Sequence, residues 1–76
     1  MRPTDEIKNI VRDMYATYCG KWDCHELTVS VDPGFSSYVV THEGNGKQVK
    51  IPSRFFPEHT NHFPIASLRN FLNKLA

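Results

Sequence analysis

The spacing at which hydrophobic residues recur changes once along the chain, and this change constrains the fold more than any other feature. Residues 26–31 alternate apolar and polar side chains, which predicts a half-buried strand. Before them, apolar residues recur three and four positions apart, which predicts an amphipathic helix. Its stripe consists of Ile7, Ile10, Val11, Met14, Tyr15 and Tyr18.

Signals for helix ends flank the first segment. Thr4 is the predicted N-cap, and Asp5 and Glu6 place negative charge in the first turn, where the helix dipole favours it. Gly20 can take the left-handed conformation that ends a helix. The sequence therefore predicts a helix from Asp5 to Cys19.

A turn signal separates the first predicted strand from a second one at residues 37–42. In Asp32-Pro33-Gly34, Pro33 presets φ at the first central position of the turn. We expect Gly34 to accept the positive φ that follows. The second strand includes Thr41 and His42 near its end, and either of them is expected on the open face.

The segment Gly44-Asn45-Gly46 predicts a tight hairpin into a third strand at residues 47–51. Val49 and Ile51 are predicted to point inward. Pro52 is expected to end the strand, because proline donates no ladder hydrogen bond.

A long connection, residues 53–63, leads to a second predicted helix that begins near Pro64. Its apolar face is formed by Ile65, Leu68, Phe71, Leu72 and Leu75. We therefore predict a single α+β domain over residues 1–76, with the order α-β-β-β-α. A three-stranded antiparallel meander is covered on one face by two helices, and the open face carries Thr28 and Lys50.

Size and composition exclude several classes of protein. A chain of 76 residues fills one thin core and has no room for a cofactor pocket beside a substrate pocket. No apolar run reaches the roughly 18 residues of a membrane helix, and no signal region opens the chain. We expect a soluble cytoplasmic protein without a cofactor. Phosphate-binding loops and nucleophile elbows are absent from the sequence.

Charge is distributed unevenly along the chain, whose net charge is +1. Residues 1–46 contain seven acidic and four basic residues, whereas residues 47–76 contain Glu58 as their one acid. The basic residues of the second part are Lys47, Lys50, Arg54, Arg69 and Lys74. They form either a face that binds RNA or an acidic protein surface, or only the solvated side of the last strand and helix.

Two segments of the C-terminal half resemble a known family. Residues 42–52 contain a histidine, a glycine-containing turn and a basic strand that ends in proline. In residues 65–76 the small residue Ala66 is followed by Ser67, Leu68 and Arg69. Both segments, and the α-β-β-β-α order, are similar to the HicA toxins, which share their architecture with double-stranded-RNA-binding domains. The resemblance spans residues 37–76.

The resemblance implies an RNA-directed protein, typically a ribonuclease toxin that a HicB-type antitoxin holds inactive. The chain departs from the family where the catalytic histidine would be, because Ser37 occupies that position. Serine does not exchange a proton near neutral pH. The resemblance therefore implies the fold and RNA association, and leaves open whether the protein is an enzyme.

Histidines and cysteines suggest two kinds of chemistry. His42 and His59, together with Lys50 and Arg54, would supply an acid, a base and positive charge for ribonuclease action if the long loop folds over the third strand. The alternative is that they are surface histidines. Cys19, Cys24, His59 and His62 have the ligand types of a zinc site, although their spacing matches no standard finger. Buried thiols are the alternative, and no metal is predicted.

Aromatic residues of the long loop have two possible roles. Phe55, Phe56 and Phe63 either stack on bases or a partner, or close the open end between sheet and helix. The leading hypothesis is an RNA-associated domain that binds through Lys47, Lys50, Arg54, His59, His62, Arg69 and Lys74. The alternative is a small inhibitor or regulator of a host protein complex. A ribonuclease using His42 is the third hypothesis.

Overall fold

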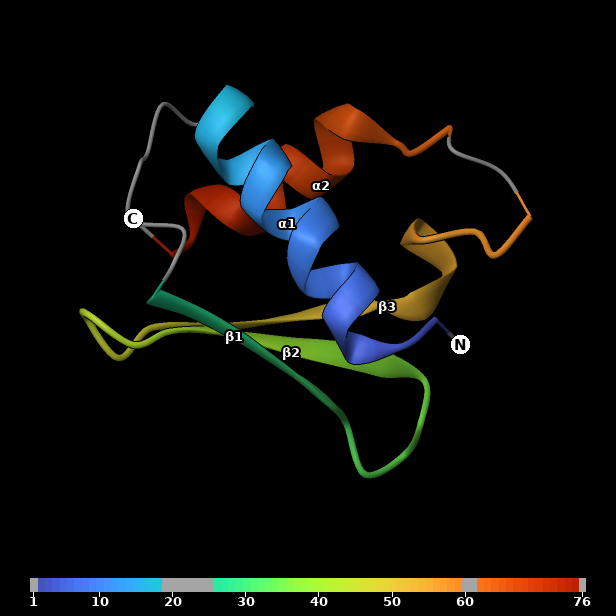
Figure 1. The fold of residues 1–76 in the computed structure, drawn as a ribbon, viewed down its shortest axis with the longest axis horizontal. Coiled ribbons are helices and arrows are strands. Elements are labelled where there is room, and N and C mark those ends of the chain that lie inside the picture. Colours follow the sequence, from blue (N-terminus) through green and yellow to red (C-terminus); the bar gives the residue numbers. More distant parts are fainter. Residues whose placement is uncertain (1, 19–25, 60–61, 76) are drawn as a thin grey trace.

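The computed structural model describes residues 2–18, 26–59 and 62–75. In chain order the elements are α1 (Thr4–Tyr18), β1 (Leu27–Val31), β2 (Ser37–His42), β3 (Gln48–Pro52), the short 3-10 helix η2 (Ser53–Phe55) and α2 (Ile65–Asn73). This order confirms the predicted α+β meander. Figure 1 shows both α-helices on one face of the sheet, and none of the described helices lies over the opposite face.

The sheet is antiparallel throughout, with β2 in the centre between β1 and β3. Its register pairs Val40 with Val29 on one side and with Val49 on the other. Val49 and Ile51 point inward, as their alternation with polar residues predicts. His42 also points inward and is buried, so Thr41 is the member of that pair on the open face.

Each helix begins directly after a proline. The first helical hydrogen bond of α1 runs from the Ile7 N–H to the Pro3 carbonyl over 3.1 Å, and that of α2 from the Leu68 N–H to the Pro64 carbonyl over 3.0 Å. Thr4 is therefore the first helical residue and not the N-cap, so that prediction is wrong. Proline suits the flanking position because it has no N–H of its own to satisfy. The predicted end at Cys19 and Gly20 lies outside the described residues.

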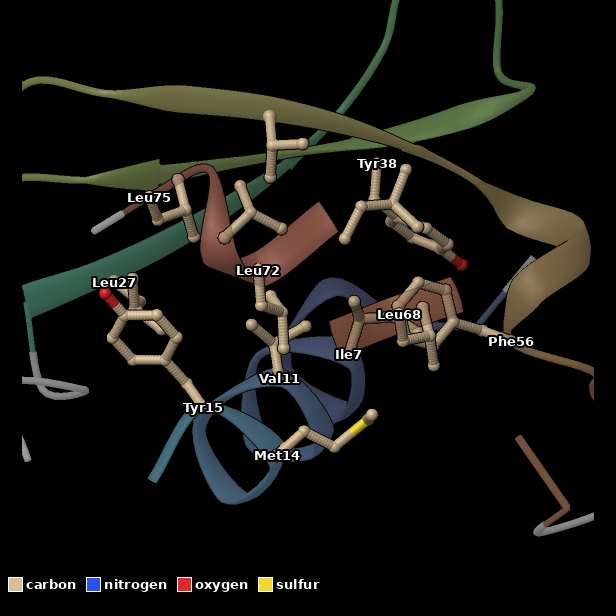
Figure 2. Close-up of a cluster of buried hydrophobic side chains, with 13 residues drawn as sticks. Ile7, Val11, Met14, Tyr15, Leu27, Tyr38, Phe56, Leu68, Leu72 and Leu75 are labelled. Carbon is tan, nitrogen blue, oxygen red and sulfur yellow. The ribbon is translucent and has the colours of Figure 1, made fainter. Parts of the chain in front are cut away.

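One hydrophobic core lies between the sheet and the helices. Figure 2 shows side chains of α1 and α2 pointing toward those of the sheet. Tyr18, at the end of the predicted stripe, stays outside the core and is 39% exposed. The buried apolar residues are Ile7, Val11, Met14, Tyr15, Leu27, Tyr38, Val40, Val49, Ile51, Phe56, Leu68, Leu72 and Leu75.

The β1–β2 turn differs from the predicted one. Asp32 and Ser37 remain paired, because the Asp32 N–H donates to the Ser37 carbonyl over 3.0 Å, and four residues are left to close the turn. The positive φ falls on Phe35, at 58°, and not on Gly34. A four-residue loop is commonly built around a type I turn, whose central residues have negative φ, so the left-handed residue comes later.

The third strand ends at Pro52, as predicted, but Pro52 itself belongs to β3, opposite Ser37, one residue beyond the predicted range 47–51. Hydrogen-bonded and non-hydrogen-bonded residue pairs alternate along β2 and β3. The His42 N–H donates to the Lys47 carbonyl and the Ser53 N–H to the Ser36 carbonyl, so these residues belong to hydrogen-bonded pairs. Residue 52 falls at a position whose amide points away from β2. The missing N–H of proline therefore removes no ladder bond, and the strand continues to this residue.

Two contacts fasten the ends of the described chain to its middle. The Tyr38 hydroxyl donates a hydrogen bond of 2.9 Å to the Arg2 carbonyl, and the Arg2 guanidinium lies 5.4 Å from the centre of the Phe63 ring. At the other end, the Asn45 amide donates to the Leu75 carbonyl over 2.7 Å. The β2–β3 turn is thereby joined to the end of α2.

No helix in residues 2–18, 26–59 and 62–75 is long and apolar enough to cross a membrane.

Candidate nucleic-acid interface

Two phenylalanines from distant parts of the chain meet at the surface. Phe55 ends η2 and Phe71 lies in α2, and their ring centres are 5.4 Å apart with an interplanar angle of 67°. Both side chains are half-buried, packed against the core on one side and open to solvent on the other. This edge-to-face pair is the centre of the candidate site.

A cation lies over each of these rings. The Arg54 guanidinium carbon is 5.2 Å from the centre of the Phe55 ring, and the Lys74 ammonium is 5.5 Å from the centre of the Phe71 ring. We call the four residues the cation–aromatic row. Each exposed cation–π contact contributes about 0.5–1 kcal/mol, enough to bias the position of a long side chain. Among the described residues, neither cation of the row has a carboxylate partner.

A depression of about 270 Å³ opens along the row. Besides the two rings and Lys74, it is lined by Ser67 and Asn70, whose side chains can donate and accept hydrogen bonds. Its size is near the lower limit for small-ligand pockets, so it suits one flat ring better than an extended molecule. The arrangement thus combines an aromatic wall, a polar wall and positive charge.

Helical geometry explains which residues of α2 line the depression. At about 3.6 residues per turn, positions 67, 70, 71 and 74 share one face, next to the buried stripe of Leu68 and Leu72. Arg69 is exposed on the opposite flank of the same helix and does not line the depression. The RNA-binding hypothesis from the sequence placed Arg69 and Lys74 on one basic surface. In the structure the two residues lie on different flanks of α2.

Lys50 extends from β3 on the open face of the sheet, where its ammonium lies 2.9 Å from the Asp32 carboxylate. The Lys50 hydrogen bond, together with that of the Gly34 N–H, lowers the pKa of Asp32 from its ordinary 3.8. Lys50 therefore has a carboxylate partner within the protein, while its side chain remains 59% exposed. Lys47 is exposed in the β2–β3 turn, and its N–H donates to the Asn45 amide oxygen over 2.9 Å.

Polar side chains on the open face of the sheet bond to one another. The Thr28 hydroxyl donates to the Glu43 carboxylate over 2.8 Å, and the Gln48 amide donates to the Thr41 hydroxyl over 3.1 Å. With Asp32 and Lys50 also paired, this face presents few free charges. It is therefore a poor match for a phosphate backbone.

His42 is only 6% exposed, at the end of β2 that leads to the β3 turn. Its ring is 6.2 Å from that of Tyr15, and its Nδ1 is buried without a hydrogen-bond partner, 3.9 Å from the Glu26 carboxylate. The Glu26 carboxylate and the His42 ring also crowd Gly44, leaving no space there for a Cβ atom.

The predicted grouping of His42, Lys50, Arg54 and His59 does not occur. Lys50 points to the opposite face of the sheet from His42. Arg54 and His59 follow β3, at the end of the sheet away from the turn next to His42 (Figure 1). His59 and His62 are exposed. The proton-transfer pair of the ribonuclease hypothesis is therefore not assembled in this structure.

The structure places Ser37 at the start of β2, where it is 8% exposed and paired with Pro52. The zinc hypothesis includes Cys19 and Cys24, which lie outside the described residues. Within the described part of the chain, no three histidine, cysteine or carboxylate side chains gather closely enough to hold a metal ion.

The loop aromatics differ in how deeply they are buried. Phe56 is 2% exposed and packs edge-on against Tyr38 and Phe63, with ring centres 5.6 and 6.2 Å away. Phe55 instead faces the depression. A second depression, of about 260 Å³, lies along α1 beside Phe63, but its one charged lining residue is Asp13. Its charge therefore opposes phosphate binding.

Comparison with known proteins gave no match among family models, curated proteins or solved structures. The site therefore has to be interpreted from its own residues. Sequence reasoning identified Arg54, Phe55 and Lys74 but not Ser67, Asn70 and Phe71 as their neighbours. Their spacing could have identified them, because Ser67, Asn70, Phe71 and Lys74 stand at i, i+3, i+4 and i+7 and so share one face of a helix.

Proposed function

We propose that this domain binds single-stranded RNA through the cation–aromatic row. The contact that carries the proposal is the edge-to-face pair of Phe55 and Phe71, with Arg54 over one ring and Lys74 over the other. Proteins bind unpaired nucleotides by stacking bases on aromatic rings beside cations that follow the backbone. The row provides both groups within one surface.

The depression gives the proposed roles. One unpaired base enters against the rings, where Ser67 and Asn70 can hydrogen-bond to its edge. Arg54 and Lys74, at the two ends of the row, contact the phosphates on either side. A base within a duplex cannot enter, because both its faces are stacked and its pairing edge is occupied. Single strands are therefore the expected ligand.

The predicted resemblance to HicA toxins and double-stranded-RNA-binding domains also favours RNA, and the α-β-β-β-α order agrees with it. In this proposal the protein binds RNA without cleaving it, since Ser37 stands at the family's catalytic position and His42 is buried. A HicB-type partner remains part of the same hypothesis.

Fluorescence anisotropy with a labelled single-stranded RNA tests the proposal. Binding should weaken as salt rises, with a slope of log K against log[salt] of about −0.7 for each phosphate neutralised. Arg54→Ala and Lys74→Ala should each weaken binding and reduce that slope by about 0.7. Arg69→Ala is the matched control, because it removes the same charge from the other flank of α2.

Three results would contradict the proposal. One is the absence of salt-dependent binding at low ionic strength. Another is an equal loss of affinity in Arg69→Ala and Lys74→Ala, which would indicate only nonspecific attraction to charge. The third is equal binding of a polyglutamate peptide, which would identify the row as a site for acidic protein.

A further inference from the structure

β1 forms one edge of the sheet, and its hydrogen bonds to β2 show which of its backbone groups face outward. At one end of the ladder the Asp32 N–H donates to the Ser37 carbonyl over 3.0 Å. At the other end the Glu43 N–H donates to the Glu26 carbonyl over 2.9 Å. Even-numbered residues of β1 therefore bond to β2, because hydrogen-bonded pairs alternate along an antiparallel ladder. The residues whose N–H and C=O groups point away from β2 are Leu27, Val29 and Val31.

These outward groups have no hydrogen-bond partner within the part of the chain that the structure describes. A strand edge of this kind is a template on which a further strand can add. Proteins commonly block such an edge with proline, with charged side chains or with a bulge. β1 has neither proline nor charge, because its sequence is Leu-Thr-Val-Ser-Val, which also favours an extended backbone.

The opposite edge of the sheet is blocked. By the same alternation, Gln48, Lys50 and Pro52 of β3 direct their backbone groups outward. Pro52 has no N–H to offer, and the charged side chain of Lys50 disfavours the addition of a strand. The helix η2 begins at Ser53, directly after this strand. The protein thus closes one edge of its sheet and leaves the other open to a strand.

The open edge is complementary to a second copy of itself. When two β1 strands run antiparallel about a two-fold axis at Val29, each Val29 faces its equivalent and Leu27 faces Val31. All three outward residues then form hydrogen-bonded pairs, and each pair exchanges two backbone hydrogen bonds. On the open face Thr28 lies opposite Ser30, and hydroxyl pairs of this kind stabilise neighbouring strands. Val29 and Val31, which are only partly buried, gain apolar neighbours.

The charges near the edge permit this pairing. Since β1 is uncharged, no like charges face each other along the paired strands. Just beyond them, Glu26 lies opposite Asp32 of the second copy, but Asp32 is bound to Lys50 over 2.9 Å. A positive charge therefore accompanies the two carboxylates. The net charge of +1 per chain also leaves little long-range repulsion between two copies.

We propose that this domain forms a two-fold homodimer in which the β1 strands pair antiparallel and the two sheets become one. The partner is a second copy of the chain, because two-fold pairing satisfies every outward group of both strands. An interface of strand edges is at the small end for protein–protein contacts, so the dimer should dissociate on dilution. It involves none of the four residues of the cation–aromatic row and does not depend on RNA binding.

Analytical ultracentrifugation of the full chain, combined with amide hydrogen exchange, tests the proposal. The apparent mass should rise with concentration from that of one chain toward that of two. Over the same range the N–H groups of Leu27, Val29 and Val31 should exchange more slowly, because they become hydrogen-bonded to the second copy. A single-chain mass at every concentration would overturn the proposal, as would a dimer that leaves these three amides unprotected.

Proline scanning of the two edges provides a matched pair of variants. Val29→Pro removes an outward N–H and leaves the ladder to β2 intact, as Pro52 does in β3. The variant should remain folded and sediment as a single chain. Gln48→Pro removes an outward N–H from the other edge and should dimerise as the wild type does. The reverse result would place the interface at β3 and contradict the proposal.

A second pair of variants does not require that the strand tolerate proline. Ser30→Lys and Gln48→Lys add one charge each at exposed positions on the two edge strands. Across the two-fold axis Ser30→Lys brings two like charges to diagonal positions, so the dimer should weaken by about fivefold. Gln48→Lys should have no such effect. Equal dimerisation in these two variants would show that β1 is not the interface.

Discussion

Lys50 and Asp32 join the third strand to the first across the open face of the sheet, with 2.9 Å between ammonium nitrogen and carboxylate oxygen. The contact spans the central strand β2, because Lys50 lies in β3 opposite Val39 and Asp32 directly follows β1. It positions Asp32, which accepts hydrogen bonds from the N–H groups of Gly34 and Phe35 in the β1–β2 turn. Lys50, one of the cations predicted to bind RNA, is therefore paired with a carboxylate of the protein itself.

Replacing Lys50 with Met should raise the pKa of Asp32 toward 3.8, because the largest cause of its lowered pKa is the Lys50 hydrogen bond. A lowered folded pKa stabilises the fold above the unfolded pKa, and this stability is lost as pH falls through the folded value. The Tm difference between wild type and Lys50→Met should therefore shrink in acid. NMR titration of the Asp32 carboxyl group measures the pKa.

The matched control for this change is Lys47→Met, which should leave the Asp32 pKa in place. The same pair of variants tests the assignment of the RNA site. Lys50→Met should weaken RNA binding less than Arg54→Ala does, because Asp32 already matches the Lys50 charge. A larger loss in Lys50→Met would move the interface to the open face of the sheet.

Phe55→Leu and Phe71→Leu should weaken RNA binding with little change in stability. Leucine keeps most of the apolar contact, so the unfolding free energy should fall by less than about 1.5 kcal/mol. Loss of a stacking ring should cost about 1–3 kcal/mol of binding free energy for each base. Anisotropy and urea denaturation measure the two quantities. Phe63→Leu, at a half-buried ring outside the row, should leave RNA affinity as it is.

Tyr38→Phe should lower the unfolding free energy by about 1 kcal/mol, because it removes the hydrogen bond to the Arg2 carbonyl. Burial raises the pKa of Tyr38 above its ordinary 10.0. A raised folded pKa stabilises the fold below the unfolded pKa, and this stability is lost as pH rises through the folded value. Alkaline pH should therefore destabilise the wild type more than Tyr38→Phe, as measured by denaturation at each pH.

His42→Leu should keep the unfolding free energy or raise it by about 1 kcal/mol, because it removes a buried Nδ1 that has no hydrogen-bond partner. RNA binding should not change, since His42 is buried and does not line the depression. Thermal denaturation and an RNA cleavage assay check both points. Cleavage by the wild type that disappears in His42→Leu would instead support the ribonuclease hypothesis.

Local pattern was enough to predict the two α-helices and the three strands, but not the 3-10 helix η2 or which of Thr41 and His42 faces inward. Alternation placed Val49 and Ile51 in the core because a pleated strand has a fixed period of two, whatever packs on it. The Phe55–Phe71 contact could not be predicted in this way. It depends on how η2 turns after Pro52 and on how α2 settles on the sheet, and both follow from tertiary packing.

The left-handed residue of the first turn was mispredicted for a related reason. Residue type favours Gly34, but the pairing of Asp32 with Ser37 decides how many residues close the loop. The structure therefore assigns the positive φ to a position that the sequence does not suggest. In the second hairpin a glycine, Gly46, takes that conformation.

The hydrogen bonds of Arg2 and Leu75 to the middle of the chain have a consequence for how this domain opens. The carbonyl of Arg2 is held by the central strand, and that of Leu75 by the β2–β3 turn. Neither helix can separate from the sheet by simple fraying, since each terminal segment is anchored to a residue in the middle of the chain. Amide hydrogens of α1, β2 and α2 should consequently exchange with solvent through a shared global opening, at similar free energies rather than in separate units.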